Sequence, residues 1–202
     1  MKRDRAEGRQ KAVWGARIGG AIAILCAIGA MSCSKAIRTG QASSYLVLNS
    51  LQGGAGESGT LGSTLASDVR GDNGIFADRG QATFQLVMKD ENGLGPSAAN
   101  AITITQYRVE YVRSDGRNAP GVDVPYPFDG AVTLTVAGGG SVGFTLVRIQ
   151  AKLESPLQAL SFHGGALAIT TIARVTFFGH DQTGREVSVT GNIEVNFADW
   201  AG

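Results

Sequence analysis

The chain has 202 residues, with 18 Lys or Arg against 17 Asp or Glu, so its formal net charge is +1. Six of the basic and two of the acidic residues lie in positions 1–33, which leaves residues 34–202 with 12 basic and 15 acidic side chains, a net charge of −3. No basic run follows Arg17, and nucleic-acid binding therefore has little electrostatic support.

The first 33 residues have the layout of a secretory signal. A basic start is followed by the apolar run Ile18–Met31, which is 14 residues long. A helix of that length, at about 1.5 Å per residue, falls short of a hydrocarbon layer roughly 30 Å thick. The run predicts a signal peptide; a transmembrane anchor remains open if Val13 and Trp14 extend the span.

The end of this run resembles the bacterial lipobox, in which a cysteine becomes the acylated first residue of the mature chain. The segment reads Ala30-Met31-Ser32-Cys33; Ser32 fits the motif, whereas Ala30 and Met31 stand where leucine and a small residue are usual. The resemblance implies a lipid on Cys33, export to the bacterial cell envelope (periplasmic or surface-facing) and membrane attachment. Residues 34–43 would then be a flexible tether. The alternative is an ordinary signal peptide cut near Ala30 or Ser32.

Both cysteines, Cys26 and Cys33, lie in this leader region. Residues 34–202 therefore cannot form a disulfide, and an exported domain without one depends on its core alone. A domain of about 150 residues can do this, because it buries close to ~70% of its unfolded surface.

Residues 44–202 read as short β runs separated by turn residues. Ala101–Arg113 changes its apolar phase midway, which predicts a β-bulge or a strand that switches sheets. The segment 185–197 alternates cleanly and forms the clearest hairpin with the run before it. Its predicted register buries Val187, Val189, Ile193, Val195 and Phe197 and exposes Glu186, Ser188, Asn192 and Glu194. Eight strands are predicted: Ser44–Leu51, Leu65–Arg70, Ala82–Lys89, Ala101–Arg113, Ala131–Val136, Phe144–Leu153, Thr170–Phe178 and Arg185–Phe197.

The segments between these runs carry turn signals. Asp72-Asn73-Gly74 and Asp78-Arg79-Gly80 are predicted turns. Pro120–Pro127 holds three prolines and is expected to be a loop or an edge. Glu154–Gly165 is expected to be irregular, with one helical turn at residues 157–160.

Strand number and spacing predict an all-β protein with two antiparallel sheets packed as a sandwich over residues 44–202. The order of the runs resembles a bacterial immunoglobulin-like domain. The stretches DGRNAPGVDVPYPFDGAVTLTV and ARVTFFGHDQTGREVSVTGNIEVNF also resemble a group of exported bacterial proteins of uncharacterised activity. This resemblance implies the fold and brings no activity with it.

Few residues suggest chemistry. His163 and His180 lie in separate loops without metal-ligand spacing, and His180 beside Asp181 is the nearest approach to a Ser-His-Asp arrangement. Arg70-Gly71-Asp72 matches the adhesive tripeptide of integrin ligands, although turn chemistry explains it equally. The carboxylates that could supply oxygen ligands to calcium are Asp68, Asp72, Asp78, Asp90, Glu91, Asp115, Asp123 and Asp129.

An aromatic platform for sugars or peptides is the remaining possibility. Tyr107 and Tyr111 share a strand face and are expected in the core, whereas Tyr126 and Phe128 are better surface candidates, with packing over a sheet end as the alternative. Trp200 completes this set.

The sequence therefore predicts a non-catalytic binding or structural module, with no catalytic, metal or cofactor site. This module is expected to be anchored by a lipid on Cys33 and to bind an unknown envelope protein or glycan. The alternative is an accessory domain or subunit of an envelope enzyme or complex.

Overall fold

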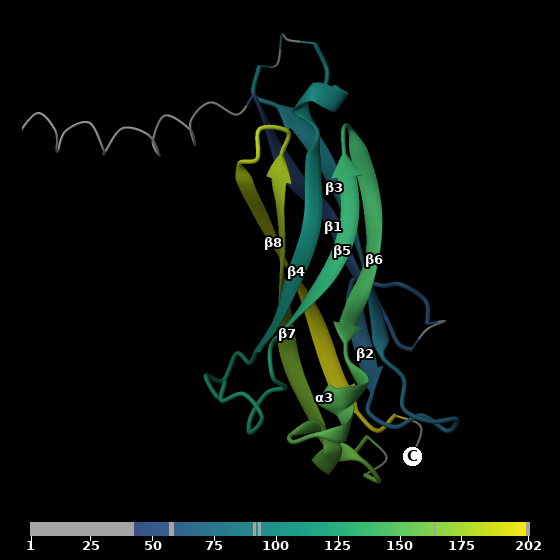
Figure 1. The fold of residues 1–202 in the computed structure, drawn as a ribbon. Helices are drawn as coiled ribbons and strands as arrows, with labels where there is room; N and C mark the ends of the chain where they lie inside the picture. Colours follow the sequence, from purple (N-terminus) through teal and green to yellow (C-terminus); the bar gives the residue numbers. More distant parts are fainter. Residues whose placement is uncertain (1–42, 57–58, 91, 93, 164, 201–202) are drawn as a thin grey trace, which may run out of the picture. The chain divides into compact units, whose positions relative to one another are not determined.

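The computed structural model describes residues 43–56, 59–90, 92, 94–163 and 165–200. These residues form an all-β sandwich of two packed sheets (Figure 1). The predicted signal peptide, Cys33 and all but the last residue of the predicted tether lie outside the described residues.

Eight strands and three short helices make up the domain. The strands are β1 (Ser44–Gly54), β2 (Thr64–Asp68), β3 (Asp78–Met88), β4 (Ile102–Val112), β5 (Phe128–Val136), β6 (Gly139–Val147), β7 (Ala168–Asp181) and β8 (Glu186–Ala198). The helices are η1 (Ala98–Asn100), α3 (Ile149–Leu153) and η2 (Leu157–Leu160).

The predicted all-β sandwich of two packed sheets is confirmed. One sheet has the order β1-β3-β6 and the other β2-β8-β7-β4-β5. The orders β1-β3-β6 and β8-β7-β4 are those in which an immunoglobulin domain arranges its strands A-B-E and G-F-C. The pair β2–β8 is parallel, unlike the antiparallel pairs elsewhere. It departs from the expected purely antiparallel sheets because the chain keeps the direction of β1 after it crosses to the second sheet (Figure 1).

The phase change in the fourth predicted strand is a β-bulge, as the alternation of side chains indicated. The register of β4 against both β5 and β7 shifts between Ile104 and Gln106. The extra residue lets Ile102 and Ile104 on one side of the bulge, and Tyr107 and Val109 on the other, all face the core.

An aromatic cluster joins the two sheets. The rings of Phe84 and Phe144 from one sheet pack edge-on against Phe177 of the other, with centroids 5.0 and 5.3 Å away. Tyr111 in β4 crosses the core and donates its hydroxyl hydrogen bond to the Leu146 carbonyl of β6 at 2.7 Å. Burial raises the pKa of the Tyr111 phenol, which therefore stays protonated as the donor.

The predicted turn at residues 78–80 is wrong, because β3 begins there. Gly80 pairs with Phe144 on β6, and a Cβ at Gly80 would lie 2.3 Å from the Phe144 ring. Glycine is needed at this position for the ring to pack across the strand, rather than for a turn. Asp78 enters the core paired with a lysine described below.

The predicted strand Phe144–Leu153 is correct only in its first part. β6 ends at Val147 and residues 149–153 form α3. The helical turn expected at residues 157–160 is present as η2.

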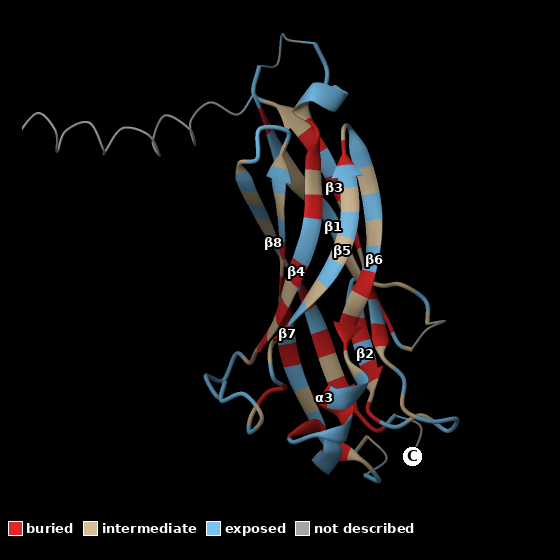
Figure 2. Cartoon of the chain, in the orientation of Figure 1, coloured by how far each residue is buried: buried red, intermediate tan, exposed pale blue. Residues whose placement is uncertain are grey.

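The register predicted for the last strand is confirmed at Ile193, Val195 and Phe197, which are buried. Val187 and Val189 face the same side, but they are only partly buried against the core. Glu186, Ser188, Asn192 and Glu194 are exposed. In β6 and β8 the buried residues lie in the half nearer α3 (Figure 2), so the core is deepest toward that end of the sandwich.

We expect Val195→Asp to lower the free energy of unfolding by several kcal/mol, because Val195 is 0% exposed and an unpaired charge would be buried there. Asn192→Asp, on the exposed face of the same strand, is the control and should change it by less than about 0.5 kcal/mol. Urea unfolding of both variants checks this; equal effects would contradict the assigned register.

Candidate functional site

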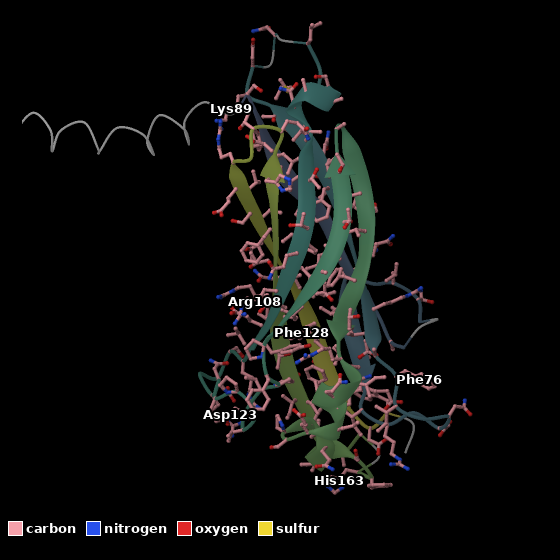
Figure 3. All side chains as sticks on the ribbon, in the orientation of Figure 1. Phe76, Lys89, Arg108, Asp123, Phe128 and His163 are labelled. Atoms are coloured by element: carbon pink, nitrogen blue, oxygen red, sulfur yellow. The ribbon has the colours of Figure 1, made fainter. Side chains whose placement is uncertain are left out.

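Exposed aromatic side chains and two recesses lie at the α3 end of the sandwich. The chain enters the described domain at the opposite end, where Ser43 accepts a hydrogen bond from the Lys89 amide; Figure 3 labels Lys89 there and Phe76 and His163 at the α3 end. The loop 69–77, the segments 148–163 and 165–167, and residues 199–200 after β8 lie at the α3 end. Three exposed aromatic side chains define what we call the aromatic end: Phe76, Phe162 and Trp200, which are 46, 75 and 50% exposed.

A buried ion pair supports these loops. Lys152 of α3 donates from Nζ to Asp78 Oδ1 at 2.9 Å, and the two side chains are only 2 and 1% exposed. The same ammonium donates to the Asp68 carbonyl at 2.7 Å. The helix after β6 is thereby fixed to the end of β2 and the start of β3.

The Asp78 carboxylate gathers two further donors. Ser67 Oγ donates to Oδ2 at 2.5 Å, and the Gly56 amide donates to Oδ1 at 2.8 Å. A buried carboxylate is tolerated only when it is paired and hydrogen-bonded. Asp78 meets both conditions, and in doing so it ties the loop after β1 to β2, β3 and α3.

Two adjoining recesses open beside this network. The larger has a volume of about 650 Å³, and the smaller of about 400 Å³; Gly71 and Gly74 line both. The amides and carbonyls of Gly71 and Gly74 bond each other at 3.1 and 3.0 Å, and Gly74 has a φ of 127°, which a glycine adopts readily. The larger recess is lined by Arg70, Gly71, Asp72, Gly74, Ile75, Phe162 and Asp199.

Phe162 is held in an unusual conformation at the mouth of the larger recess. Its φ is 67°, a left-handed conformation that costs on the order of 1–3 kcal/mol for a non-glycine residue. Its amide donates to Asp199 Oδ2 at 2.5 Å, and the Arg70 guanidinium lies 4.5 Å from its ring centroid. Backbone strain on an exposed aromatic residue is typical of binding sites rather than of packing.

Asp199 lies just after β8 and is only 1% exposed. Among the described residues, its Oδ1 has no hydrogen-bond partner, although Oδ2 accepts from Phe162. A buried carboxylate oxygen without a donor is rare in native structures, and each case calls for an explanation.

The sequence candidate at His180 and Asp181 does not form a catalytic pair. Asp181 accepts hydrogen bonds from the Thr183 hydroxyl and amide and from the Arg185 amide, so it organises the β7–β8 turn. His180 lines a separate recess of about 690 Å³ on the outer face of its sheet, with Phe178 and Glu186 among its neighbours.

Most of the other loop carboxylates with described contacts also accept hydrogen bonds from backbone amides. Asp90, Asp115 and Asp123 each accept from an amide within four residues, and Asp129 pairs with Arg108. Glu91 lies outside the described residues. Within the described part of the chain, no three His, Cys, Asp or Glu side chains are grouped closely enough to hold a metal ion.

The aromatic residues that were predicted to form a platform do not share one surface. Tyr107 and Tyr111 are buried in the core as expected, and Phe128 is buried under the Arg148 guanidinium, 4.3 Å from its ring centroid. Tyr126 and Trp200 are exposed. Sequence reasoning missed Phe76, Phe162 and Asp199; the available signal was a large aromatic residue in each of two loops that lack any strand or helix periodicity.

The adhesive tripeptide is part of the loop that lines both recesses. Asp72, Asn73 and Gly74 form the predicted turn, and Arg70 reaches back to the Phe162 ring. The guanidinium is therefore engaged with this protein's own aromatic side chain.

Comparison of the chain with models of protein families and with curated proteins finds no match. In the part that the structure describes, none of the helices has the length and apolar character needed to cross a membrane.

We expect Lys152→Met to cost roughly 3–5 kcal/mol, because it leaves the buried Asp78 carboxylate without its counter-charge. Adding Asp78→Asn to this variant should restore about 1–2 kcal/mol of the lost free energy of unfolding. The asparagine side chain is neutral, and its oxygen can still accept a hydrogen bond from the Gly56 amide. Lys89→Met, an exposed lysine, is the control. Guanidinium unfolding measures all three; a Lys152→Met variant within about 1 kcal/mol of the parent would show that the pair does not stabilise the fold.

The contribution of the Asp181 carboxylate to the free energy of unfolding should be lost at acidic pH. Burial alone would raise the pKa of this carboxyl, but the hydrogen bonds from Thr183 and Arg185 outweigh burial and lower the pKa below its ordinary value. Since the unfolded pKa is about 3.9, the stabilisation is complete above that value and lost as the pH falls through the lower, folded pKa. The difference in Tm between the parent and Asp181→Asn should therefore shrink from about pH 6 to about pH 2; a constant difference would contradict it.

Proposed function

We propose that the chain is a non-catalytic binding module of the bacterial cell envelope, which contacts its partner through the aromatic end. The observation that carries the proposal is the set of exposed aromatic side chains, Phe76, Phe162 and Trp200, around two recesses at one end of the sandwich. Aromatic residues are enriched at protein interfaces and dominate their binding energy.

The position of this end supports the proposal. The chain joins the sandwich at Ser43, and strands of 11 to 14 residues separate that point from the aromatic end by roughly 40 Å. A module tethered through residues 34–43 would therefore present the aromatic end as the part of the domain farthest from its attachment. The partner remains an envelope protein or glycan.

The polar groups at the aromatic end favour binding over catalysis. Lys152 and Asp78 are committed to each other and are buried. Catalysis by a general acid, base or nucleophile requires several reactive groups that converge on one point. In the described lining of the larger recess, the Arg70 guanidinium instead contacts the Phe162 ring, and the Asp199 carboxylate accepts a hydrogen bond from the Phe162 amide.

Site-specific photo-crosslinking of the full-length chain in its own envelope tests the proposal. A photo-reactive amino acid replaces Phe162 in one variant and Phe178, which is 37% exposed in β7, in the control. We expect a discrete adduct from position 162 and little from position 178. Equal adducts at both positions, or none at 162, would overturn the assignment of the aromatic end.

A second candidate, a subunit of a larger envelope complex, is favoured by the edge strand β6. Among the described strands it pairs only with β3, and it has no charge or proline, the usual protections of a free edge. Gly143→Lys places a charge on this edge at an exposed position, where an added Cβ makes only an ordinary contact, 3.9 Å from the Gly80 carbonyl oxygen. Release of the protein from a large assembly in a sedimentation experiment would support this candidate; unchanged sedimentation would count against it.

Attachment to the membrane through a lipid on Cys33 completes the proposal. Cys33→Ser should yield an unprocessed or released form, because anchoring by acyl chains contributes about 0.8 kcal/mol per buried CH₂ and needs two or more chains to hold firmly. Mass spectrometry of the mature N-terminus measures the modification. A free amine at Ser34 or an unmodified Cys33 thiol in the parent protein would refute it.

A further inference from the structure

The buried carboxylate of Asp199 is the least satisfied group at the aromatic end. Its Oδ2 is fixed by the Phe162 amide, while its Oδ1 finds no donor among the described residues. The side chain lines the larger recess and is 1% exposed. An N–H donor entering from the recess would supply the missing hydrogen bond, and a charged donor would also neutralise the carboxylate.

The charged side chains around the larger recess favour a positively charged ligand. Asp72 and Asp199 line it with one cation, Arg70. Asp68 lies in the adjoining recess, and its carboxylate accepts from the Arg70 and Trp200 amides. Lys152 does not alter this balance, because it is paired with Asp78. The two carboxylates of this recess and the neighbouring Asp68, against the single guanidinium of Arg70, favour a cation.

The Phe162 ring provides the second contact. It already accepts a guanidinium, since Arg70 lies 4.5 Å from the ring centroid; aromatic faces attract cations of this kind. Arg70 is itself exposed and is free to leave the ring for solvent. The protein's own arginine thus occupies, in the unbound state, an aromatic face that an incoming cation can share or take over.

We propose that the larger recess binds a basic side chain, a lysine ammonium or an arginine guanidinium, displayed by a partner protein, with Asp199 Oδ1 as its acceptor and Phe162 as its aromatic contact. This inference rests on the proposed binding function and names the chemistry of its ligand. Phe162 is a positioning residue as well, because its amide orients the carboxylate.

The test uses isotope-labelled full-length chain in mild detergent, with the amide signal of Phe162 as the reporter. The probes are Nα-acetyl-lysine amide, its Nε-acetylated counterpart, which has no charge, and Nα-acetyl-glutamate amide. We expect a saturable shift with the lysine probe and none with the other two. Equal binding of the neutral probe, or preferential binding of the acidic probe, would overturn the proposal.

Three variants locate the contact. Asp199→Asn keeps an oxygen for the Phe162 amide and removes the charge, so it should fold with an equal or higher Tm and bind the lysine probe at least tenfold more weakly. Glu186→Gln, which removes an exposed carboxylate from the separate recess beside His180, is the control and should bind within threefold of the parent. Arg70→Ala should bind equally or more tightly, because it removes a competitor for the ring.

Undiminished binding by Asp199→Asn, or loss of binding by Arg70→Ala, contradicts the proposal. If Asp199→Asn does not fold, the comparison of charged and neutral probes on the parent protein still decides the matter. Crosslinking at position 162 without selectivity for the lysine probe refutes this inference and leaves the proposed function standing. Selective binding of the lysine probe without crosslinking refutes the proposed function alone.

Discussion

The organisation of the aromatic end depends on one buried contact, the ion pair between Asp78 and Lys152. The Lys152 ammonium and the Asp78 carboxylate together bind Ser67 and Asp68 at the end of β2 and Gly56 in the loop after β1, whereas Lys152 itself lies 74 positions after Asp78. Neither charge can be buried alone without a cost of several kcal/mol. The loop after β1, the end of β2 and the helix after β6 are therefore obliged to meet at one place, and the recesses form beside it.

Different contacts hold the two sheets together and fix the loops at the aromatic end. The aromatic cluster of Phe84, Phe144 and Phe177 joins the two sheets without any contribution from the loops. The ion pair then fixes the loops at one end, where Phe162 is held in a left-handed conformation and the Asp199 carboxylate is left with an unused oxygen. Strain and an unsatisfied polar group in an otherwise well-packed domain are expected where binding, rather than stability, determines the residues.

Much of the fold was predictable, because it follows from local patterns. Strict alternation gave the register of β8, and the change of phase in residues 101–113 gave the bulge in β4. The sequence-based predictions were wrong where the position of a residue depends on a partner far away in the sequence. Asp78 reads as a turn residue until Lys152, 74 positions away, is known to neutralise it. Phe162 and Asp199 are 37 positions apart in segments without periodicity, so no local signal brings them together and the candidate site was missed.

Amide hydrogen exchange of the full-length chain, compared between the parent and the double variant Asp78→Asn with Lys152→Met, tests whether the ion pair organises the loops of the aromatic end. We expect faster exchange at Gly56, in residues 69–77 and in residues 148–162, with the protection of β3, β4 and β7 unchanged. Uniform loss of protection across all strands would show that the pair holds the whole fold, and unchanged protection of these loops would show that it does not organise the aromatic end.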